Sequence, residues 1–442
     1  MNKPQDKPLH TLGLIEVVRG GIESGRFTAE AYTQALLARI AALDEKIQAW
    51  AWLKPEAALQ AARRCDESRQ SGITGPLLGL PIGVKDIFAT AGVPTEMGSP
   101  AFIGHVPKAS ARVVERLEAR GAFVMGKTVT TECAFLSPGK TRNPWNPLHT
   151  PGGSSSGSAA AVAARFLPAA LGTQTNGSVI RPAAFCGVVG FKPTQGLIPI
   201  EGALTFSQTL DQPGLFTRGV ADMAWLAAAL CEGEGKPDAV CRRSSPPRLA
   251  ALKTPVWDLA EEPAKQRFLE SIRILREGGA IVEERELPAP FDHAHEAVRT
   301  IMSVESAFNL EALFAKKAPL LSSTLRDFIA EGRAAAAVDY LQALRLRLQL
   351  QEELERFLAP FDAAITLPAT GEAPASLEQT GNPAFCSLWS LCGVPAVTIP
   401  VGLGPRGLPL GLQIVGAKGK DSQVLAAAGW CEGLFPFSPW EG

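Results

Sequence analysis

The sequence predicts an α/β fold, a single large domain over residues 1–442 in which a mixed central β-sheet lies between helical layers. Segments with strand character alternate with segments of helical periodicity, which favours such a layered architecture. No clean linker or internal repeat divides the 442 residues. Apolar residues make up 46% of the chain and charged residues 20%, which is typical of a globular domain.

The elements are predicted from hydrophobic periodicity and from the glycine and proline residues that interrupt it. Helical periodicity marks residues 12–44 (two helices with a turn at 24–27), 109–120, a helix starting after Ser158, 217–230, 262–279, an almost wholly helical segment at 294–358 that closes with 340–358, and 421–430. Short apolar runs mark strands at 74–86, 122–125, 185–194, 280–287, 363–368, 396–401 and 409–415. Residues 243–248 read as a polar connector. We expect 294–358 to be a helical insertion that packs on the core and covers a pocket.

Charge and composition argue against several kinds of partner. The formal net charge of −1 favours neither nucleic acid nor an anionic membrane. No run of about 18 apolar residues could span a bilayer, and the N-terminus lacks the apolar core of a signal peptide. Eight cysteines (65, 133, 186, 231, 241, 386, 392 and 431) form no C-x-x-C pair, so we expect reduced thiols in a cytosolic protein. The five histidines show no metal-ligand spacing, so we expect neither a metal nor another cofactor.

Lys85 stands near the end of the apolar run TGPLLGLPIGVKD, an unusual place because lysine is rarely fully buried. Its position alone leaves two interpretations open. Lys85 is either a buried functional lysine, or it has left the strand and pairs with Asp86 at the surface.

Residues 121–128 (GAFVMGKT) fit the P-loop pattern G-x-x-x-x-G-K-[ST], with Lys127 as its lysine. The context is wrong for a phosphate cradle, because a helix precedes the motif and its middle residues are apolar strand formers. Gly121 is better explained as the C-cap of that helix. Nucleotide binding through Lys127 therefore stays a remote alternative.

The stretch at 151–182, PGGSSSGSAAAVAARFLPAALGTQTNGSVIRP, carries two Gly/Ser clusters separated by small residues. Glycine beside serine indicates a backbone that approaches a ligand closely or adopts positive φ. The alanine run after Ser158 predicts a helix that is apolar all round and therefore buried. The serines at its head should then lie deep in the protein.

Lys85 and these hydroxyls are the candidates for chemistry. A serine hydroxyl is a poor nucleophile until a base removes its proton, and with histidine scarce the available base is lysine. Burial with few carboxylates nearby would lower the pKa of Lys85 and supply its neutral form. Backbone N–H groups at 175–178 could form an oxyanion hole. The residues alone suggest acyl transfer, although Gly/Ser clusters are more often turns or linkers.

Long segments also resemble the amidase signature family of serine amidohydrolases. They are GGSSSGSAAAVAA with the following GTQTNGSVIRPAAFCGVVGFKPT, GLPIGVKDIFATAGVPTEMGS around Lys85, and the C-terminal GLPLGLQIVG. The resemblance runs from about residue 12 to about residue 432, with a core signature at about 74–200, and it implies the fold of that family.

The resemblance also implies roles for individual residues. Lys85 matches the base, Ser154 the bridging serine behind a cis Gly153–Ser154 peptide bond, and Ser178 the nucleophile. The backbone groups that it implies for the oxyanion hole belong to Thr175, Asn176 and Gly177.

Three positions depart from the common family pattern. Asn176 and Gln174 stand where many members carry glycine and aspartate, and an asparagine side chain would change the pocket or add a polar contact. Arg181 lies three residues after Ser178, a variant similar to malonamidase-like members in which the arginine holds a substrate carboxylate. Arg181 is therefore a candidate substrate-binding residue, or else it pairs with a buried acid or caps carbonyl groups. The chain is apolar near Leu136, which argues against a malonamate-like substrate.

Residues 153–157 also fit G-x-S-x-G, the nucleophile elbow of α/β-hydrolases, centred on Ser155. That interpretation needs an acid and then a histidine downstream. His293 and His295 are the only candidates, and neither has a recognisable loop context, so we treat the match as a coincidence of serine-rich sequence.

Together these observations predict a cytosolic hydrolase that cleaves the C–N bond of a small amide, carbamate or ureido compound through a Ser178 acyl-enzyme, with side activity on esters. The expected partners are the small-molecule amide and, for assembly, a second copy of the chain. The alternative within the family is a glutaminase subunit of a tRNA-dependent amidotransferase, which needs partner subunits. A catalytically dead scaffold is not favoured, because Lys85, Ser154 and Ser178 are all present.

Overall fold

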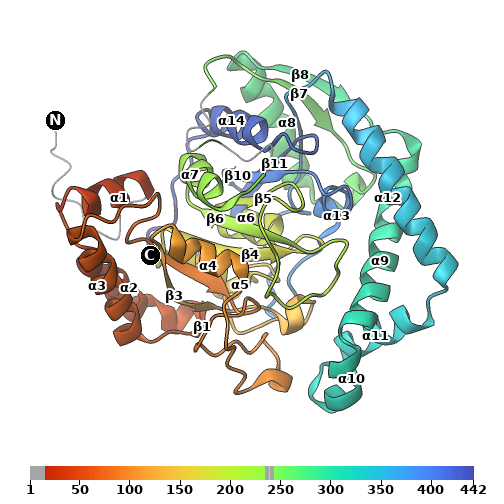
Figure 1. The fold of residues 1–442 in the computed structure, drawn as a ribbon. Helices are drawn as coiled ribbons and strands as arrows, with labels where there is room; N and C mark the ends of the chain where they lie inside the picture. The colour runs from red at the N-terminus through yellow and green to blue at the C-terminus, as the bar shows by residue number, and fades with distance from the viewer. Residues whose placement is uncertain (1–14, 234–237, 239–242) are drawn as a thin grey trace.

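The computed structural model describes residues 15–233, 238 and 243–442. Residues 12–14 of the first predicted helical segment, and Cys241, lie outside the described residues. The described part forms a single domain built on one mixed sheet with helices layered against it (Figure 1), as the sequence predicts.

Eleven strands make up the sheet, in the order β1-β3-β2-β4-β6-β5-β10-β11-β9-β7-β8. Neighbouring strands are parallel in the β3-β2-β4 and β9-β7-β8 segments and antiparallel elsewhere. The strands are β1 (Trp50–Trp52), β2 (Pro81–Lys85), β3 (Phe123–Thr128), β4 (Ala169–Gln174), β5 (Val189–Lys192), β6 (Gln212–Thr217), β7 (Arg248–Leu252), β8 (Ile281–Arg285), β9 (Ala363–Thr366), β10 (Ala396–Leu403) and β11 (Pro409–Val415).

The α-helices pack on this sheet and on one another. They are α1 (Ile15–Glu23), α2 (Ala29–Ile47), α3 (Pro55–Gln70), α4 (Arg112–Ala119), α5 (Ser156–Ala163), α6 (Ile180–Cys186), α7 (Val220–Leu230), α8 (Glu262–Glu277), α9 (Ala294–Asn309), α10 (Glu311–Lys317), α11 (Ser323–Ala334), α12 (Ala337–Leu358), α13 (Ala384–Leu391) and α14 (Asp421–Glu432). Within the part of the chain that the structure describes, no helix is both long enough and apolar enough to cross a membrane.

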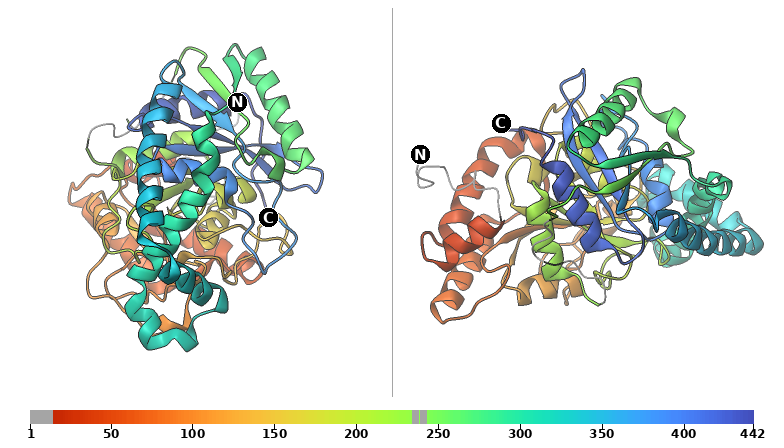
Figure 2. Two further views of the ribbon diagram at one scale, coloured as in Figure 1. Left: turned by 90° about the vertical axis from the view of Figure 1, so that its right-hand side faces the viewer. Right: turned by 90° about the horizontal axis from the view of Figure 1, so that it is seen from above.

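The helical segment predicted at 294–358 is present as α9 to α12 with short connections, and we keep the name insertion for these helices. These helices stand along one side of the molecule, and α1 to α3 stand at the opposite end (Figures 1 and 2). The insertion packs on the body through α9, which contacts α11, α12 and α13.

Three predicted elements are wrong in part, each at a glycine. The strand expected at 74–86 is confined to β2, because the preceding segment turns at Gly79, whose φ is +73°. The strand expected at 185–194 begins only at β5, because α6 runs on to Gly187, whose φ of +67° ends the helix. The helix expected at 217–230 starts at α7, after Gly219, and Thr217 ends β6 instead.

Several elements have no counterpart in the prediction: β1, α3, β4, α6, β6, β7 and α13. The sequence of β4, AALGTQ, shows why. It consists of small residues without the Val and Ile content that marks a strand, and tertiary pairing with β2 and β6 makes it one.

Candidate active site

The predicted serines lie at the head of α5, deep in the protein. All eight residues of α5 are buried, and Ser154 is 1% exposed. The helix contacts β2 and β4, two neighbouring parallel strands. Because parallel strands end at the same edge of a sheet, the end of β2 and the end of β4 meet beside α5. This confirms the prediction that the hydroxyls are buried.

Lys85 is the last residue of β2 and is completely buried. Its Nζ donates to Ser154 Oγ at 2.7 Å and to Thr173 Oγ1 at 2.8 Å. Burial lowers the pKa of Lys85 to about 7, and the Asp211 carboxylate opposes that shift. Lys85 and Ser154, which are far apart in the sequence, are therefore in direct contact, with a lysine that is partly neutral at neutral pH.

The interpretation of Lys85 as a surface residue paired with Asp86 is wrong. Asp86 faces Lys127 instead, with 3.5 Å between Oδ1 and Nζ. Lys127 lies in β3, fully buried, and also donates to Phe88 O and Thr95 Oγ1, each at 2.6 Å. A lysine committed to these acceptors inside a strand cannot cradle a phosphate, so the P-loop alternative is wrong as well.

Arg181 lies in α6 and is 3% exposed. Its guanidinium donates to Gly153 O at 2.7 Å, to Gly381 O at 2.8 Å and to Thr380 Oγ1 at 3.3 Å. Two of these contacts are to carbonyl groups, as the interpretation of Arg181 as a cap of carbonyl groups expects. One of them holds the carbonyl of the peptide bond that precedes Ser154. That Gly153–Ser154 bond is cis, as the resemblance implies.

Ser178 lies on the turn between β4 and α6, which we call the nucleophile loop (residues 175–179). Ser178 is 8% exposed, the most accessible of the three predicted catalytic residues. Among the described residues, no hydrogen bond occupies the backbone N–H groups of Asn176, Gly177 and Ser178. Gly177 is needed for close packing, because a Cβ there would lie 2.9 Å from Pro383 Cβ. The loop thus presents free N–H groups beside the candidate nucleophile, the arrangement that an oxyanion hole requires.

Two family departures, Asn176 in this loop and Gln174 at the end of β4, are linked by hydrogen bonds to α13. Ser387 Oγ donates to Asn176 Oδ1 at 2.6 Å, and Ser390 Oγ donates to the Asn176 carbonyl. Gln174 Nε2 donates to Ser390 Oγ at 3.0 Å. Gln174 Oε1 accepts from the N–H groups of Val179 and Ile180 at 2.8 and 3.0 Å, which caps the start of α6. Asn176 therefore adds the polar contact that the sequence suggests.

Sequence reasoning missed Thr173 and Asp211. Thr173 follows from the alternation of side chains along β4, once β4 is recognised as a strand beside β2. Asp211 Oδ1 accepts from Thr175 Oγ1 at 2.5 Å. Burial raises the pKa of Asp211 to about 6, and its hydrogen bonds and Lys85 oppose the shift. No local pattern in the sequence connects Asp211 with the nucleophile loop.

A cavity of about 600 Å³ opens next to the nucleophile loop. Its wall combines aromatic and aliphatic side chains with a polar rim: Phe135, Leu136, Asn176, His295, Val298, Arg299, Met302, Thr324, Asp327, Phe328, Glu331, Asn382, Pro383, Ala384 and Ser387. Helices α9 and α11 supply more than half of these residues, so the insertion forms a wall of this cavity. We call it the insertion cavity.

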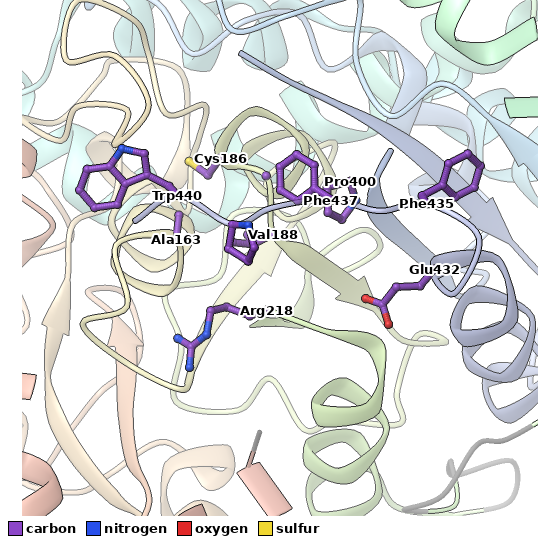
Figure 3. Close-up of a pocket in the computed structure, with 11 residues that line it drawn as sticks. Ala163, Cys186, Val188, Arg218, Pro400, Glu432, Phe435, Phe437 and Trp440 are labelled. Atoms are coloured by element: carbon purple, nitrogen blue, oxygen red, sulfur yellow. The ribbon is translucent and has the colours of Figure 1, made fainter. Parts of the chain in front are cut away.

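A smaller cavity of about 180 Å³ is lined by Phe435, Phe437 and Trp440 of the C-terminal segment together with Arg218, Glu432 and other residues (Figure 3). None of the predicted site residues lines it. Elsewhere in the described ranges, no group of three or more His, Cys, Asp or Glu side chains could hold a metal ion.

The elbow-like serine, Ser155, has a structural role. Its Oγ donates to Thr173 O at 3.1 Å and accepts from Thr173 N at 3.2 Å, so the hydroxyl ties α5 to β4. His295 lies in α9 on the wall of the insertion cavity.

The family model for Amidase matches residues 31–425 of this chain. The A subunit of glutamyl-tRNA(Gln) amidotransferase from Chloroflexus aurantiacus (strain ATCC 29366 / DSM 635 / J-10-fl) is 34% identical over 94% of this chain and 95% of its own length. The protein of the same name from Symbiobacterium thermophilum is 34% identical over 92% and 93%.

Solved structures of amidases share the fold. One described as a crystal structure of amidase superposes with a TM-score of 0.87 at 31% identity, covering 96% of this chain and all of its own. Native peptide amidase from Stenotrophomonas maltophilia gives a TM-score of 0.84 at 29% identity, with 97% and 98% covered. With a family match over most of its length and relatives above 30% identity, this chain belongs to the amidase signature family and is an amidase by class.

Proposed function

We propose that this chain hydrolyses the C–N bond of an amide through an acyl-enzyme on Ser178. The observation that carries the proposal is the 2.7 Å contact between Lys85 Nζ and Ser154 Oγ, two side chains that are both buried. Only a neutral amine can act as a base, and a pKa lowered to about 7 gives Lys85 a substantial neutral fraction at neutral pH.

In the proposed reaction the neutral amine of Lys85 takes the proton of Ser154, and Ser154 takes the proton of Ser178. The Ser178 oxygen attacks the amide carbonyl, and the N–H groups of the nucleophile loop stabilise the negative oxygen that forms. The proton returns along the same route to the nitrogen as the C–N bond breaks, which leaves an acyl ester on Ser178 and a free amine. Water activated by the same route cleaves that ester. These steps need no metal ion or organic cofactor.

We propose that the oxyanion hole is built from the backbone of Thr175, Asn176 and Gly177. For Arg181, its three hydrogen-bond acceptors within the protein support a positioning role, in which it fixes the Gly153 carbonyl and thereby Ser154. Binding of a substrate carboxylate by Arg181 stays a prediction, tested below.

The curated relatives favour glutamine as the amide, because their names describe one component of a glutamyl-tRNA(Gln) amidotransferase. On that ground a glutaminase subunit is better supported than the small-amide hydrolase that the sequence analysis favours. In that role the chain would work with partner subunits. A homodimer and a cytosolic location stay predictions.

A small-amide hydrolase is the second candidate, and the insertion cavity supports it. The inner wall is apolar at Phe135, Val298 and Phe328, all buried. At the rim, Arg299 is committed to Glu331, with Nε donating to Oε1 at 2.7 Å. A cavity without an uncommitted guanidinium on its wall suits a neutral acyl group better than an α-carboxylate. The neighbours named as amidases agree with this choice.

Covalent labelling tests the shared chemistry. After treatment with phenylmethylsulfonyl fluoride, intact-protein mass spectrometry and peptide mapping should find one adduct, on the peptide that contains Ser178, and none on Ser178→Ala. An adduct confined to another serine would contradict the proposed nucleophile. Ammonia release from L-glutamine and from benzamide, each with the wild type and Ser178→Ala, then ranks the two candidates. Turnover of benzamide but not of glutamine by the chain alone would favour the small-amide hydrolase.

A further inference from the structure

The segment that precedes β6, residues 206–211, lies against the nucleophile loop and is held by a buried carboxylate. Asp211 Oδ2 accepts from the N–H groups of Phe206 at 2.7 Å and Ser207 at 3.0 Å, and its other oxygen accepts from the Thr175 hydroxyl at 2.5 Å. Asp211 therefore shapes its own segment with one oxygen and ties it to the nucleophile loop with the other. We call residues 206–211 the bridging segment.

A second buried carboxylate, from the insertion, also holds the bridging segment. Glu305, in α9 of the insertion, is 1% exposed. Its Oε2 accepts from Thr209 N at 2.9 Å and from the Ser207 hydroxyl, and its Oε1 accepts from the Thr209 hydroxyl. Tyr340, in α12, donates its hydroxyl to Glu305 Oε1 at 2.8 Å.

Such carboxylates fix geometry because losing a donor is costly. A buried charge is tolerated only when hydrogen bonds replace its water, and a network is stable only when all its members are satisfied. Glu305 has four donors and Asp211 three, drawn from α12, the bridging segment and the nucleophile loop. The positions of α9 and of Thr175 are therefore set relative to each other through a continuous series of hydrogen bonds.

We propose that Glu305 and Asp211 are positioning residues, which carry the placement of the helical insertion to the nucleophile loop and so to Ser178. The proposal rests on the proposed function, since it assigns these residues to acylation of Ser178. The same α9 helix lines the insertion cavity with Val298 and Met302, so in this proposal one helix lines the cavity for the acyl group and also aligns the nucleophile.

The test compares variants that remove single hydrogen bonds of this series. Glu305→Gln and Tyr340→Phe act at the insertion, and Thr175→Val removes the hydroxyl donor while Thr175→Ser keeps it. Glu355→Gln, an exposed position in α12, is the matched control for the loss of a carboxylate. The quantities measured are kcat per titrated active site, KM, and the acid limb of kcat with pH, with active sites counted from the phenylmethylsulfonyl adduct on Ser178.

We expect kcat per titrated site to fall by about ten- to hundred-fold in Glu305→Gln and Thr175→Val, because displacement of a reacting group by an ångström costs on the order of a hundred-fold. Tyr340→Phe should cost less, and Thr175→Ser should lose much less kcat than Thr175→Val because it keeps the hydroxyl donor to Asp211. Glu355→Gln should stay near the wild type. In Asp211→Asn we expect a lower kcat and an acid limb displaced to lower pH, because the lost carboxylate no longer raises the pKa of Lys85. In Glu305→Gln the limb should not move.

Wild-type kcat per titrated site in Glu305→Gln and Thr175→Val would overturn the proposal, since a purely structural role would lower only the number of active sites. Equal losses in Thr175→Ser and Thr175→Val would overturn it too. If Asp211→Asn does not fold, the comparison of Thr175→Val with Thr175→Ser still tests the proposal. Failure of the proposed function is distinguishable, because then the wild type itself forms no adduct on Ser178.

Discussion

The core around α5 and the helical insertion differ most clearly in burial. All eight residues of α5 are buried, and its sequence SGSAAAVA lacks any charge. In α12, only four of 22 residues are buried, and Val338, Leu341 and Leu348 are more than half exposed. The core therefore excludes water from Lys85, whereas the insertion shares its surface with solvent.

This contrast separates chemistry from recognition. A lysine base needs a dry site to lose its charge, and small side chains let α5 approach β2 and β4 closely enough to provide one. Recognition of an acyl group needs a wall that contacts it, and we expect the insertion to supply part of that wall, because α9 and α11 line the insertion cavity. Substitutions in the core should therefore affect every substrate, and so should substitutions at Glu305, which acts on the nucleophile loop. Substitutions of insertion residues on the wall of the insertion cavity should affect some substrates more than others.

Ser178→Ala should break the core function most completely. Loss of a catalytic nucleophile costs on the order of 10⁵- to 10⁶-fold in kcat, because the acyl-enzyme cannot form. Release of ammonia or amine from any amide substrate measures the loss, and circular dichroism should show an intact fold. Substantial remaining turnover would remove Ser178 from this role.

The pH dependence of turnover should report the titration of Lys85. Since Lys85 is a base only when neutral and its pKa is about 7, kcat should rise as the pH rises through about 7 and level off above it. Two pH units below that pKa, the neutral fraction and kcat should be about a hundred-fold lower. Lys85→Ala should lose most activity at every pH. A flat profile from pH 5 to pH 9 in the wild type would contradict a lysine base.

Much of the core could be predicted from the sequence because its constraints are local. The alanine run alone predicts a helix that is apolar all round and therefore buried. The burial of Ser154, at the head of that helix, follows from this pattern. The helical periodicity of 294–358 likewise predicts α9 to α12. Local pattern missed the small-residue strand β4 and its neighbour β6 altogether, and it misplaced the ends of other elements at Gly187 and Gly219.

The contacts between core and insertion could not be predicted, because they join distant segments. Glu305 and Ser207 are 98 residues apart in the chain, and neither residue stands in a motif. The pairing of Asp86 with Lys127 rather than Lys85 likewise depends on β3 lying beside β2. Only the three-dimensional arrangement assigns these partners.

Arg181→Ala sharpens the comparison, because one interpretation of Arg181 assigns it to the chemistry of the core and the other assigns it to substrate recognition. If Arg181 is a positioning residue, Arg181→Ala should lower kcat for all amides by about ten-fold or more, because the Gly153 carbonyl loses its donor. If Arg181 binds a substrate carboxylate, Arg181→Ala should raise KM for carboxylate-bearing amides alone. Kinetics on succinamate and on a neutral amide of similar length separate the two, and equal effects on both would support positioning.

Phe328→Leu should have the smallest effect and the most selective one. Phe328 lies in α11 on the wall of the insertion cavity, stacked on Phe135 with ring centroids 4.5 Å apart. An aromatic acyl group in the cavity would extend this stack, and an aromatic pair contributes about 0.5–1.5 kcal/mol, so kcat/KM for benzamide should fall by about two- to ten-fold.

The insertion acts on recognition only if the change in Phe328→Leu depends on the substrate. We expect kcat/KM for a short aliphatic amide such as propionamide to stay within about two-fold, below the contribution of one aromatic pair. The acid limb near pH 7 should not move, because Phe328 carries no charge and does not contact Lys85. Phe308→Leu, at a position in α9 that is 71% exposed, is the matched control and should leave both substrates unchanged. An equal loss on both amides in Phe328→Leu would mean that the cavity wall, and not only the hydrogen-bond series through Glu305, acts on the chemistry itself rather than on the choice of acyl group.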